Sequence, residues 1–158
     1  MVLLKNGNVF IAGGSGEVGT FLRATKTCWL FQPTTGTYSP CKPMPKPMTK
    51  HTCALFKGKI YIVGREEDSS AVYDPIQNIW SEGPRFTNNL RTYTGSMTMF
   101  QGSLYFREYY SKNGQAIYKL EDSNSWSLAI QIKTKTKDDI FPMTKLVFGQ
   151  CHLMGFVI

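Results

Sequence analysis

The sequence has few charged residues, few histidines and no long hydrophobic run. Charged residues make up 18% of its 158 residues, and only two residues are histidine. The longest apolar runs, such as residues 60–63, have the length of a strand and are too short to cross a bilayer. The first residues lack the pattern of a signal peptide, and no N-x-Ser/Thr acceptor occurs. We therefore expect a cytoplasmic globular protein without membrane contact.

The sequence also lacks paired cysteines. Its four cysteines are scattered along the chain: Cys28, Cys41, Cys53 and Cys151. The absence of a C-x-x-C pair argues against a structural zinc site. A hairpin over residues 26–43, centred on Thr34 and Thr35, would place Cys28 opposite Cys41, close enough for a disulfide. Without a secretion signal, we expect reduced thiols there instead.

The net charge of +7 permits an acidic partner but does not require one. Five lysines fall within residues 42–59, and Lys133, Lys135 and Lys137 alternate along a short stretch. Alternation would place these three on one face of a strand. No aromatic platforms or recognisable nucleic-acid module accompany the lysines. We expect a charged edge strand there and no nucleic-acid partner.

A glycine run raises the question of a nucleotide site. Gly14, Gly16 and Gly19 spell G-x-G-x-x-G directly after a β-branched run. A dinucleotide site would need a helix next and a carboxylate about twenty residues later. The following sequence is rich in threonine and aromatics, and no Asp or Glu occurs between Glu17 and Glu66. We therefore predict a long loop over residues 15–26 and no cofactor.

The chain repeats itself. Residues 4–14, 55–65 and 99–109 each have an apolar lead, a turn glycine and a dense β-branched or aromatic strand. The turn glycines coincide: Gly7, Gly58 and Gly102. A shorter stretch, residues 149–155, matches the same pattern. Four short strands per unit, with a period of 42 to 51 residues, are typical of β-propeller blades.

A second element follows each of the three units, at residues 28–40, 70–84 and 115–127. Each has two aromatic residues seven or eight positions apart, with turn formers between them. This pattern predicts three hairpins, each with an aromatic pair across its strands. The predicted pairs are Phe31 with Tyr38, Tyr73 with Trp80, and Tyr118 with Trp126.

The units resemble kelch repeats, the blades of a kelch β-propeller. The second is the clearest, with His51, Gly58, Tyr73-Asp74-Pro75, Asn78 and Trp80 in the positions of the family pattern. The resemblance implies an all-β fold of four-stranded antiparallel blades in an incomplete ring. Its blades would cover residues 1–45, 46–89 and 90–140, with a partial fourth at 141–158.

The family's diglycine after the second strand varies between the units. It is intact as Gly13-Gly14, becomes Gly64-Arg65 in the second unit, and is replaced by Arg107-Glu108 in the third. Glycine would allow close backbone approach at the end of a crowded inner strand. The residues that the resemblance assigns to the structural motif are Gly13, Gly14, Gly58, Gly64, Tyr73, Asp74, Pro75, Trp80, Gly102, Tyr118 and Trp126.

The resemblance implies a protein-binding module that is not an enzyme. Ligands would meet loops between the second and third strands, at residues 15–26, 65–70 and 107–115. The loops between blades would be residues 45–51, 84–94 and 128–144. Among the cationic residues of these loops, six could clamp the carboxylates of an acidic peptide. They are Arg23, Lys50, Arg65, Arg85, Arg91 and Arg107.

Enzymatic and scaffold functions are the alternatives. Some kelch-fold proteins resemble galactose oxidase, a copper enzyme, but the sequence has no recognisable block of its ligands. We expect His51 to pack or to bond a turn, His152 to be half-buried, and neither to bind metal. The acidic run at residues 66–68 lacks ligand spacing.

Three and a half blades cannot close a ring, so open edges would favour self-association, and an oligomeric scaffold remains open. We expect a segment of a longer kelch protein or a truncated product, with assembly with another chain as the alternative. Many kelch propellers recognise substrates within ubiquitin-ligase adaptors, and the resemblance extends that role to this chain by analogy alone.

Overall fold

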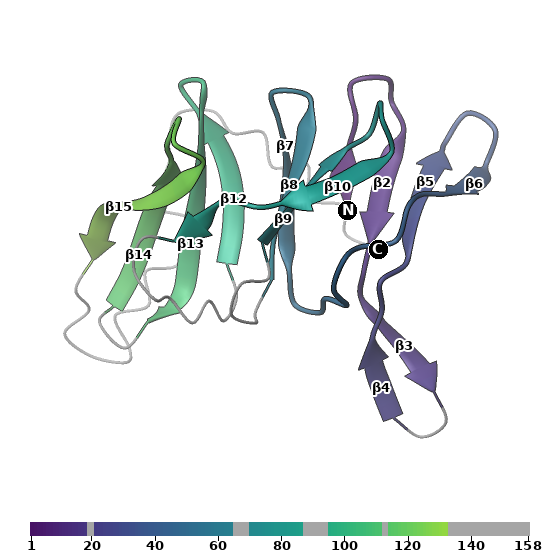
Figure 1. Cartoon of the computed structure of the whole chain (residues 1–158), viewed down its shortest axis with the longest axis horizontal. Helices are drawn as coiled ribbons and strands as arrows, with labels where there is room; N and C mark the ends of the chain where they lie inside the picture. Colours follow the sequence, from purple (N-terminus) through teal and green to yellow (C-terminus); the bar gives the residue numbers. More distant parts are fainter. Residues whose placement is uncertain (19–20, 65–69, 87–94, 112–113, 133–158) are drawn as a thin grey trace.

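A computed structural model describes residues 1–18, 21–64, 70–86, 95–111 and 114–132. Over these residues the chain forms strands and turns, and no helix. Three sheets of four or five strands stand side by side, and a separate two-stranded hairpin extends from the first of them (Figure 1). The predicted all-β fold of antiparallel blades is confirmed, and the described residues do not form a closed barrel.

The first sheet, blade 1, has the strand order β1-β2-β5-β6. Its strands are β1 (Val2–Leu3), β2 (Val9–Ala12), β5 (Cys28–Gln32) and β6 (Thr37–Pro40). Gly7 lies in the turn between β1 and β2 with a φ of 82°, a conformation that favours glycine. The turn between β5 and β6 is centred on Thr34 and Thr35, as predicted, because Gln32 pairs with Thr37.

The second sheet, blade 2, has the order β10-β9-β8-β7. Its strands are β7 (Thr52–Phe56), β8 (Lys59–Val63), β9 (Ser70–Asp74) and β10 (Ile79–Glu82). Lys57 and Gly58 form a two-residue turn with φ values of 48° and 79°, the tight type that matches strand twist. The turn position predicted for Gly58 is confirmed.

The third sheet, blade 3, contains β12 (Gly95–Phe100), β13 (Ser103–Ser111), β14 (Gly114–Leu120) and β15 (Ser125–Ile132). A fifth strand, β11 (Arg85–Phe86), pairs in parallel with β15. The predicted loops at residues 107–115 and 128–144 are therefore wrong in part. Strand β13 runs on through Ser111, and β15 continues to Ile132, because these apolar and aromatic segments pair with their neighbours.

The loop predicted at residues 15–26 is a hairpin. Strands β3 (Ser15–Val18) and β4 (Phe21–Ala24) pair with each other and project away from the blades (Figure 1). Pairing satisfies the backbone groups of a segment that lies outside the blade core. No helix follows the glycine run in the part of it that the structure describes, as the sequence predicted.

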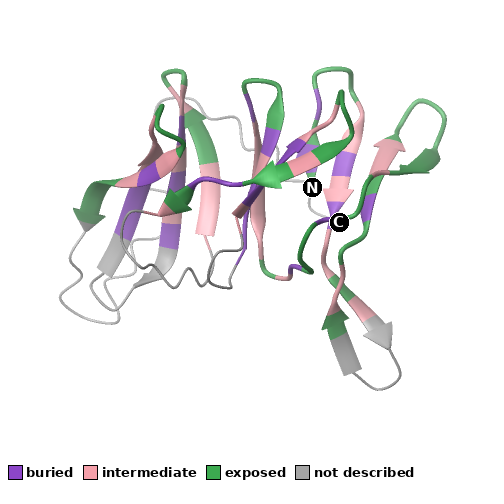
Figure 2. Ribbon diagram, viewed as in Figure 1, coloured by how far each residue is buried: buried purple, intermediate pink, exposed green. Residues whose placement is uncertain are grey.

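The three blades pack face to face, with β1 and β12 on either side of β7. One core lies between blades 1 and 2 and includes Phe10, Ile60 and Tyr73. The other lies between blades 2 and 3 and includes Leu104 and Trp126. Figure 2 shows the buried residues concentrated on the strands inside each sheet. Blade 2 therefore contributes to both cores.

Two of the three predicted aromatic pairs are confirmed. Phe31 lies opposite Tyr38 with ring centroids 4.6 Å apart, and Tyr73 lies opposite Trp80 at 4.8 Å. In blade 3 the prediction is wrong, because Trp126 pairs with Leu120 and not with Tyr118.

The position of the turn explains the difference in blade 3. Pairing begins with Leu120 opposite Trp126, so Tyr118 lies opposite Leu128, and the register shift comes only after Tyr118. Phe86 of the added strand β11 then stacks on Trp126 at 5.7 Å. The aromatic partner of Trp126 is therefore Phe86, which lies on the connection between blades 2 and 3.

Candidate functional site

The base of the β3–β4 hairpin is tied to the connection between blades 1 and 2. The Gly14 N–H donates to the Met48 carbonyl at 3.0 Å, and the Thr25 N–H donates to the Gly14 carbonyl at 3.0 Å. Thr25 and Met48 form an antiparallel bridge, and the Met48 N–H donates to the Thr25 carbonyl. These bonds fix how the hairpin leaves the blade.

His51 completes this junction. Its Nε2 lies 2.9 Å from the carbonyl oxygen of Ala12, so Nε2 carries a proton and donates it to this carbonyl. Burial lowers the pKa of His51, mainly by desolvation, which favours the neutral ring. A Cβ added to Gly13 would lie 2.8 Å from the His51 ring. The expected packing of His51 is confirmed, and its hydrogen bond goes to the end of strand β2 and not to a turn.

Two of the predicted cationic residues lie close in sequence to the bridge at the hairpin base. Arg23 precedes the bridged residue Thr25 by two residues, and Lys50 follows its partner Met48 by two. Both side chains are exposed. The two segments that carry these cations are joined by the bridge, so an anion bound beside it would have positive charge on both segments.

The other four predicted cations do not join them in the described structure. Arg85 lies on β11 and its Nη2 is 2.6 Å from Glu82 Oε1. Arg107 lies within β13, opposite Ser96 and Ile117. Arg65 and Arg91 lie outside the described residues. A single basic face formed by all six therefore stays a prediction.

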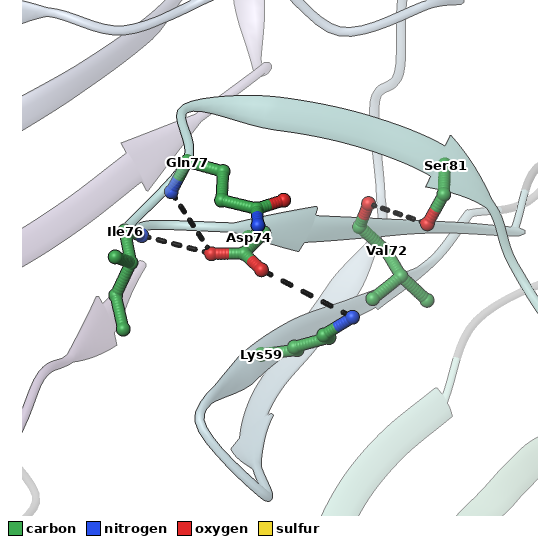
Figure 3. Close-up of polar contacts among 6 residues, drawn as sticks. All are labelled: Lys59, Val72, Asp74, Ile76, Gln77 and Ser81. Atoms are coloured by element: carbon green, nitrogen blue, oxygen red, sulfur yellow. Dashed lines mark hydrogen bonds and ion pairs between the residues drawn. The ribbon is translucent and has the colours of Figure 1, made fainter.

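The motif residues of blade 2 form a turn (Figure 3). Asp74 Oδ1 accepts hydrogen bonds from the N–H groups of Ile76 at 2.9 Å and Gln77 at 3.1 Å. Its Oδ2 lies 4.0 Å from Lys59 Nζ, and the Ser81 hydroxyl donates to the Val72 carbonyl across the hairpin. Asp74 thus holds the turn that Pro75 begins.

Asn78, Tyr73 and Trp80 join blade 2 to the connection from blade 1. Asn78 Oδ1 accepts hydrogen bonds from the Tyr73 hydroxyl at 2.7 Å and from the Lys42 N–H at 2.8 Å. Trp80 Nε1 donates to the Lys42 carbonyl at 2.7 Å. Asn78 Oδ1 and Trp80 Nε1 therefore both bond the backbone of Lys42 and hold the two blades together.

The described cysteines are free thiols: Cys28, Cys41 and Cys53. The predicted register is confirmed, since the Cys41 N–H donates to the Cys28 carbonyl at 2.9 Å across the hairpin. Desolvation by burial raises the pKa of Cys28 to about 11, and burial also raises the pKa of Cys53. These two thiols are poor nucleophiles, because the thiolate is the reactive form.

Sequence reasoning missed one unusual group, the carboxyl of Glu108. It lies on β13 between Gly95 and Ala116, is 3% exposed, and its Oε2 has no hydrogen-bond partner. Desolvation by burial raises the pKa of Glu108 to about 7. Burial, followed by the charge of Glu108, raises the pKa of Tyr118 to about 12. The replacement of the family's diglycine by Arg107-Glu108 was the available signal.

Among the described residues, no three histidine, cysteine or acidic side chains gather where they could hold a metal ion. His152, Cys151, the acidic run at 66–68 and the partial unit at 141–158 lie outside the described part of the chain. Within that part, no helix has the length and apolar character needed to cross a membrane.

No protein-family model matches the chain. Over 59 residues it is 36% identical to Kelch-like protein 30 of Homo sapiens. The match covers 37% of this chain and 10% of that protein, so the chain spans about a tenth of the relative's length. This similarity and the stacked four-stranded sheets are consistent with a kelch-type repeat.

Proposed function

We propose that the chain is a protein-interaction module that binds an acidic peptide segment of a partner at the base of the β3–β4 hairpin. The observation that carries this proposal is that two exposed cations, Arg23 and Lys50, lie on the two segments that the Thr25–Met48 bridge joins. The net charge of +7 favours an acidic partner.

The hairpin suits recognition because it stands clear of the blade faces while its base is fixed. A peptide approaching β3 or β4 meets a short two-stranded sheet, whose two strands pair with no third strand among the described residues (Figure 1). Backbone pairing at such an edge supplies affinity without depending on side chains, and the cations select for acidic residues.

The test uses a fluorescein-labelled peptide of alternating glutamate and serine and its counterpart with glutamine in place of glutamate. We expect fluorescence anisotropy to detect binding of the acidic peptide. The double variant Arg23→Glu/Lys50→Glu should weaken it by at least about tenfold, because repulsion replaces attraction.

The matched control is Lys5→Glu/Lys57→Glu, which changes the net charge equally. Both lysines are exposed in turns between the first and second strands, at the opposite end of the blades from the hairpin. Equal loss of binding in the two double variants would mean unspecific attraction by the net charge. Absence of binding by the unmodified chain would reject the acidic ligand.

A role as the substrate-recognition part of a ubiquitin-ligase adaptor is a further proposal, and it rests on the family resemblance alone. In that role, ubiquitination of a captured partner would be lost together with binding in the Arg23→Glu/Lys50→Glu variant.

A further inference from the structure

The strand register of blade 1 places two thiols, those of Cys28 and Cys41, opposite each other. In the β5–β6 pair, Trp29 lies opposite Pro40, so the next pair outward is Cys28 with Cys41. The Cys41 N–H donates to the Cys28 carbonyl at 2.9 Å, which continues the ladder by one pair. Residues directly opposite each other on antiparallel strands point to the same face of the sheet. The two thiols therefore lie on one face of blade 1.

The spacing of such a pair suits a disulfide. Hydrogen-bonded pairs on antiparallel strands have Cα atoms about 5.5 Å apart, and disulfides join Cα atoms about 4.4–6.8 Å apart. Cys53 has no such neighbour, since it lies opposite Ile62 and its Sγ donates to the Met1 carbonyl at 3.6 Å. Of the three described cysteines, only Cys28 and Cys41 are in register for a disulfide.

The two thiols differ in exposure. Cys28 is 3% exposed in the core between blades 1 and 2, whereas Cys41 is half-buried at the margin of that core. Both lie near the Tyr73 hydroxyl of blade 2: burial raises the pKa of Tyr73, and Cys41 and then Cys28 raise it further. An oxidant from solvent therefore meets Cys41 first, and Cys28 reacts from within the core.

We propose that Cys28 and Cys41 form a redox-sensitive pair, which a peroxide converts from two thiols into a disulfide across the β5–β6 hairpin. Lys42, the residue after Cys41, bonds Asn78 and Trp80 of blade 2 through its backbone. The disulfide therefore fastens the start of the connection to blade 2. This modification goes beyond the proposed peptide binding and does not depend on it, since it uses no residue of the β3–β4 hairpin.

The reaction has two steps. Hydrogen peroxide first oxidises the Cys41 thiol to a sulfenic acid: an S–O bond forms, the O–O bond breaks, and the thiol proton leaves with the second oxygen as water. The Cys28 sulfur then attacks the sulfur of Cys41, so that an S–S bond forms, the S–O bond breaks, and the Cys28 proton leaves in a second water. The raised pKa of Cys28 slows this second step, but the strand pairing offsets that effect by holding the two residues opposite each other.

The test is oxidation of the reduced full chain with hydrogen peroxide, followed by alkylation of the remaining thiols and peptide mass mapping of the monomer without reduction. The expected result is a pair of peptides joined through Cys28 and Cys41, which dithiothreitol separates, while Cys53 is alkylated. If Cys28 is still alkylated as a free thiol after oxidation, or if it forms its disulfide with Cys53 or Cys151, the proposal is wrong.

Cys41→Ser should abolish the joined peptides. Cys53→Ser is the matched control and should leave them unchanged, because Cys53 is out of register on β7. Oxidation of the unmodified chain should also raise its thermal midpoint by at least about 5 °C, because the bond closes the loop of residues 28–41 in the unfolded chain. Dithiothreitol should reverse this rise. An equal rise in Cys41→Ser, or no rise in the unmodified chain, would overturn the effect proposed for the disulfide.

Discussion

Glu108 is a carboxyl group in an apolar position, and this makes it the residue with the clearest pH dependence. Burial raises its pKa from 4.5 to about 7, so the folded chain holds this proton more tightly than the unfolded chain does. Below pH 4.5 the group is protonated in both states, and its effect on stability is absent. The penalty grows as the pH rises to 7 and stays constant above it.

We predict that Glu108→Gln stabilises the chain at pH 8 by about 3 kcal/mol and has little effect at pH 4, since each pKa unit is worth about 1.4 kcal/mol. The measurement is the free energy of unfolding in urea, for the unmodified protein and for the Glu108→Gln variant across this pH range. Subtracting one free energy from the other removes the effect of His51, which is the same in both proteins and whose lowered pKa destabilises the fold as the pH falls.

Glu82→Gln is the control for this change, because Glu82 is exposed on β10 and paired with Arg85. Its pKa is lowered, chiefly by the hydrogen bond from Arg85. A stability difference for Glu108→Gln that is the same at pH 4 and pH 8 would contradict the assigned state of Glu108.

At the scale of strands and turns, the sequence predicted what depends on local chemistry. Gly58 fixes a tight turn, and Asp74 and Asn78 fix the next one, so the register of blade 2 follows from residues inside each hairpin. The partner of Trp126 could not be predicted in this way. Phe86 reaches it from a different segment, across a strand pairing that no local pattern encodes.

In the candidate site, too, local sequence predicted some features and tertiary contacts decided the others. Arg23 and Lys50 were both predicted as binding residues, but it is the single bridge between Thr25 and Met48 that joins their two segments. Glu108 was missed because its burial depends on packing between blades and not on its neighbours in sequence. The residue types indicated where charged groups and turns lie in the sequence. The tertiary contacts decide which charged segments come together in the fold.

The end of β2 provides a test of crowding at a junction between elements. Gly13 has a φ of 64°, and an added Cβ would lie 2.8 Å from three atoms, in His51, Met44 and Met48. Gly36 has nearly the same φ, 67°, and no atom within 4 Å of such a Cβ. The two glycines therefore share the backbone requirement and differ in the space available.

We predict that Gly36→Ala destabilises the chain by about 1 kcal/mol from its left-handed backbone alone. Gly13→Ala should cost about 1–3 kcal/mol more, because it overpacks the junction. Thermal and urea unfolding of the two variants measure this difference. Equal destabilisation would show that the junction relaxes around the methyl group.

At the scale of the whole chain, blade 2 is the element that both cores share. Ile60 faces blade 1 and Phe56 belongs to the core with blade 3, so each outer blade depends on the middle one. In repeat proteins, stability is the sum of the units and of the interfaces between neighbours. Loss of packing in blade 2 should therefore destabilise blade 3 as well, even when the substituted residue faces blade 1.

We predict that Ile60→Ala lowers the free energy of unfolding by about 2–5 kcal/mol, as expected for a fully buried isoleucine. Amide hydrogen exchange should show reduced protection both in β5 of blade 1 and in β13 of blade 3, because the blades unfold together. Ile79→Ala, at a residue 43% exposed on β10, should leave both strands protected. If Ile60→Ala lowers protection in β5 and leaves β13 unchanged, blade 3 folds independently and the two cores are not coupled.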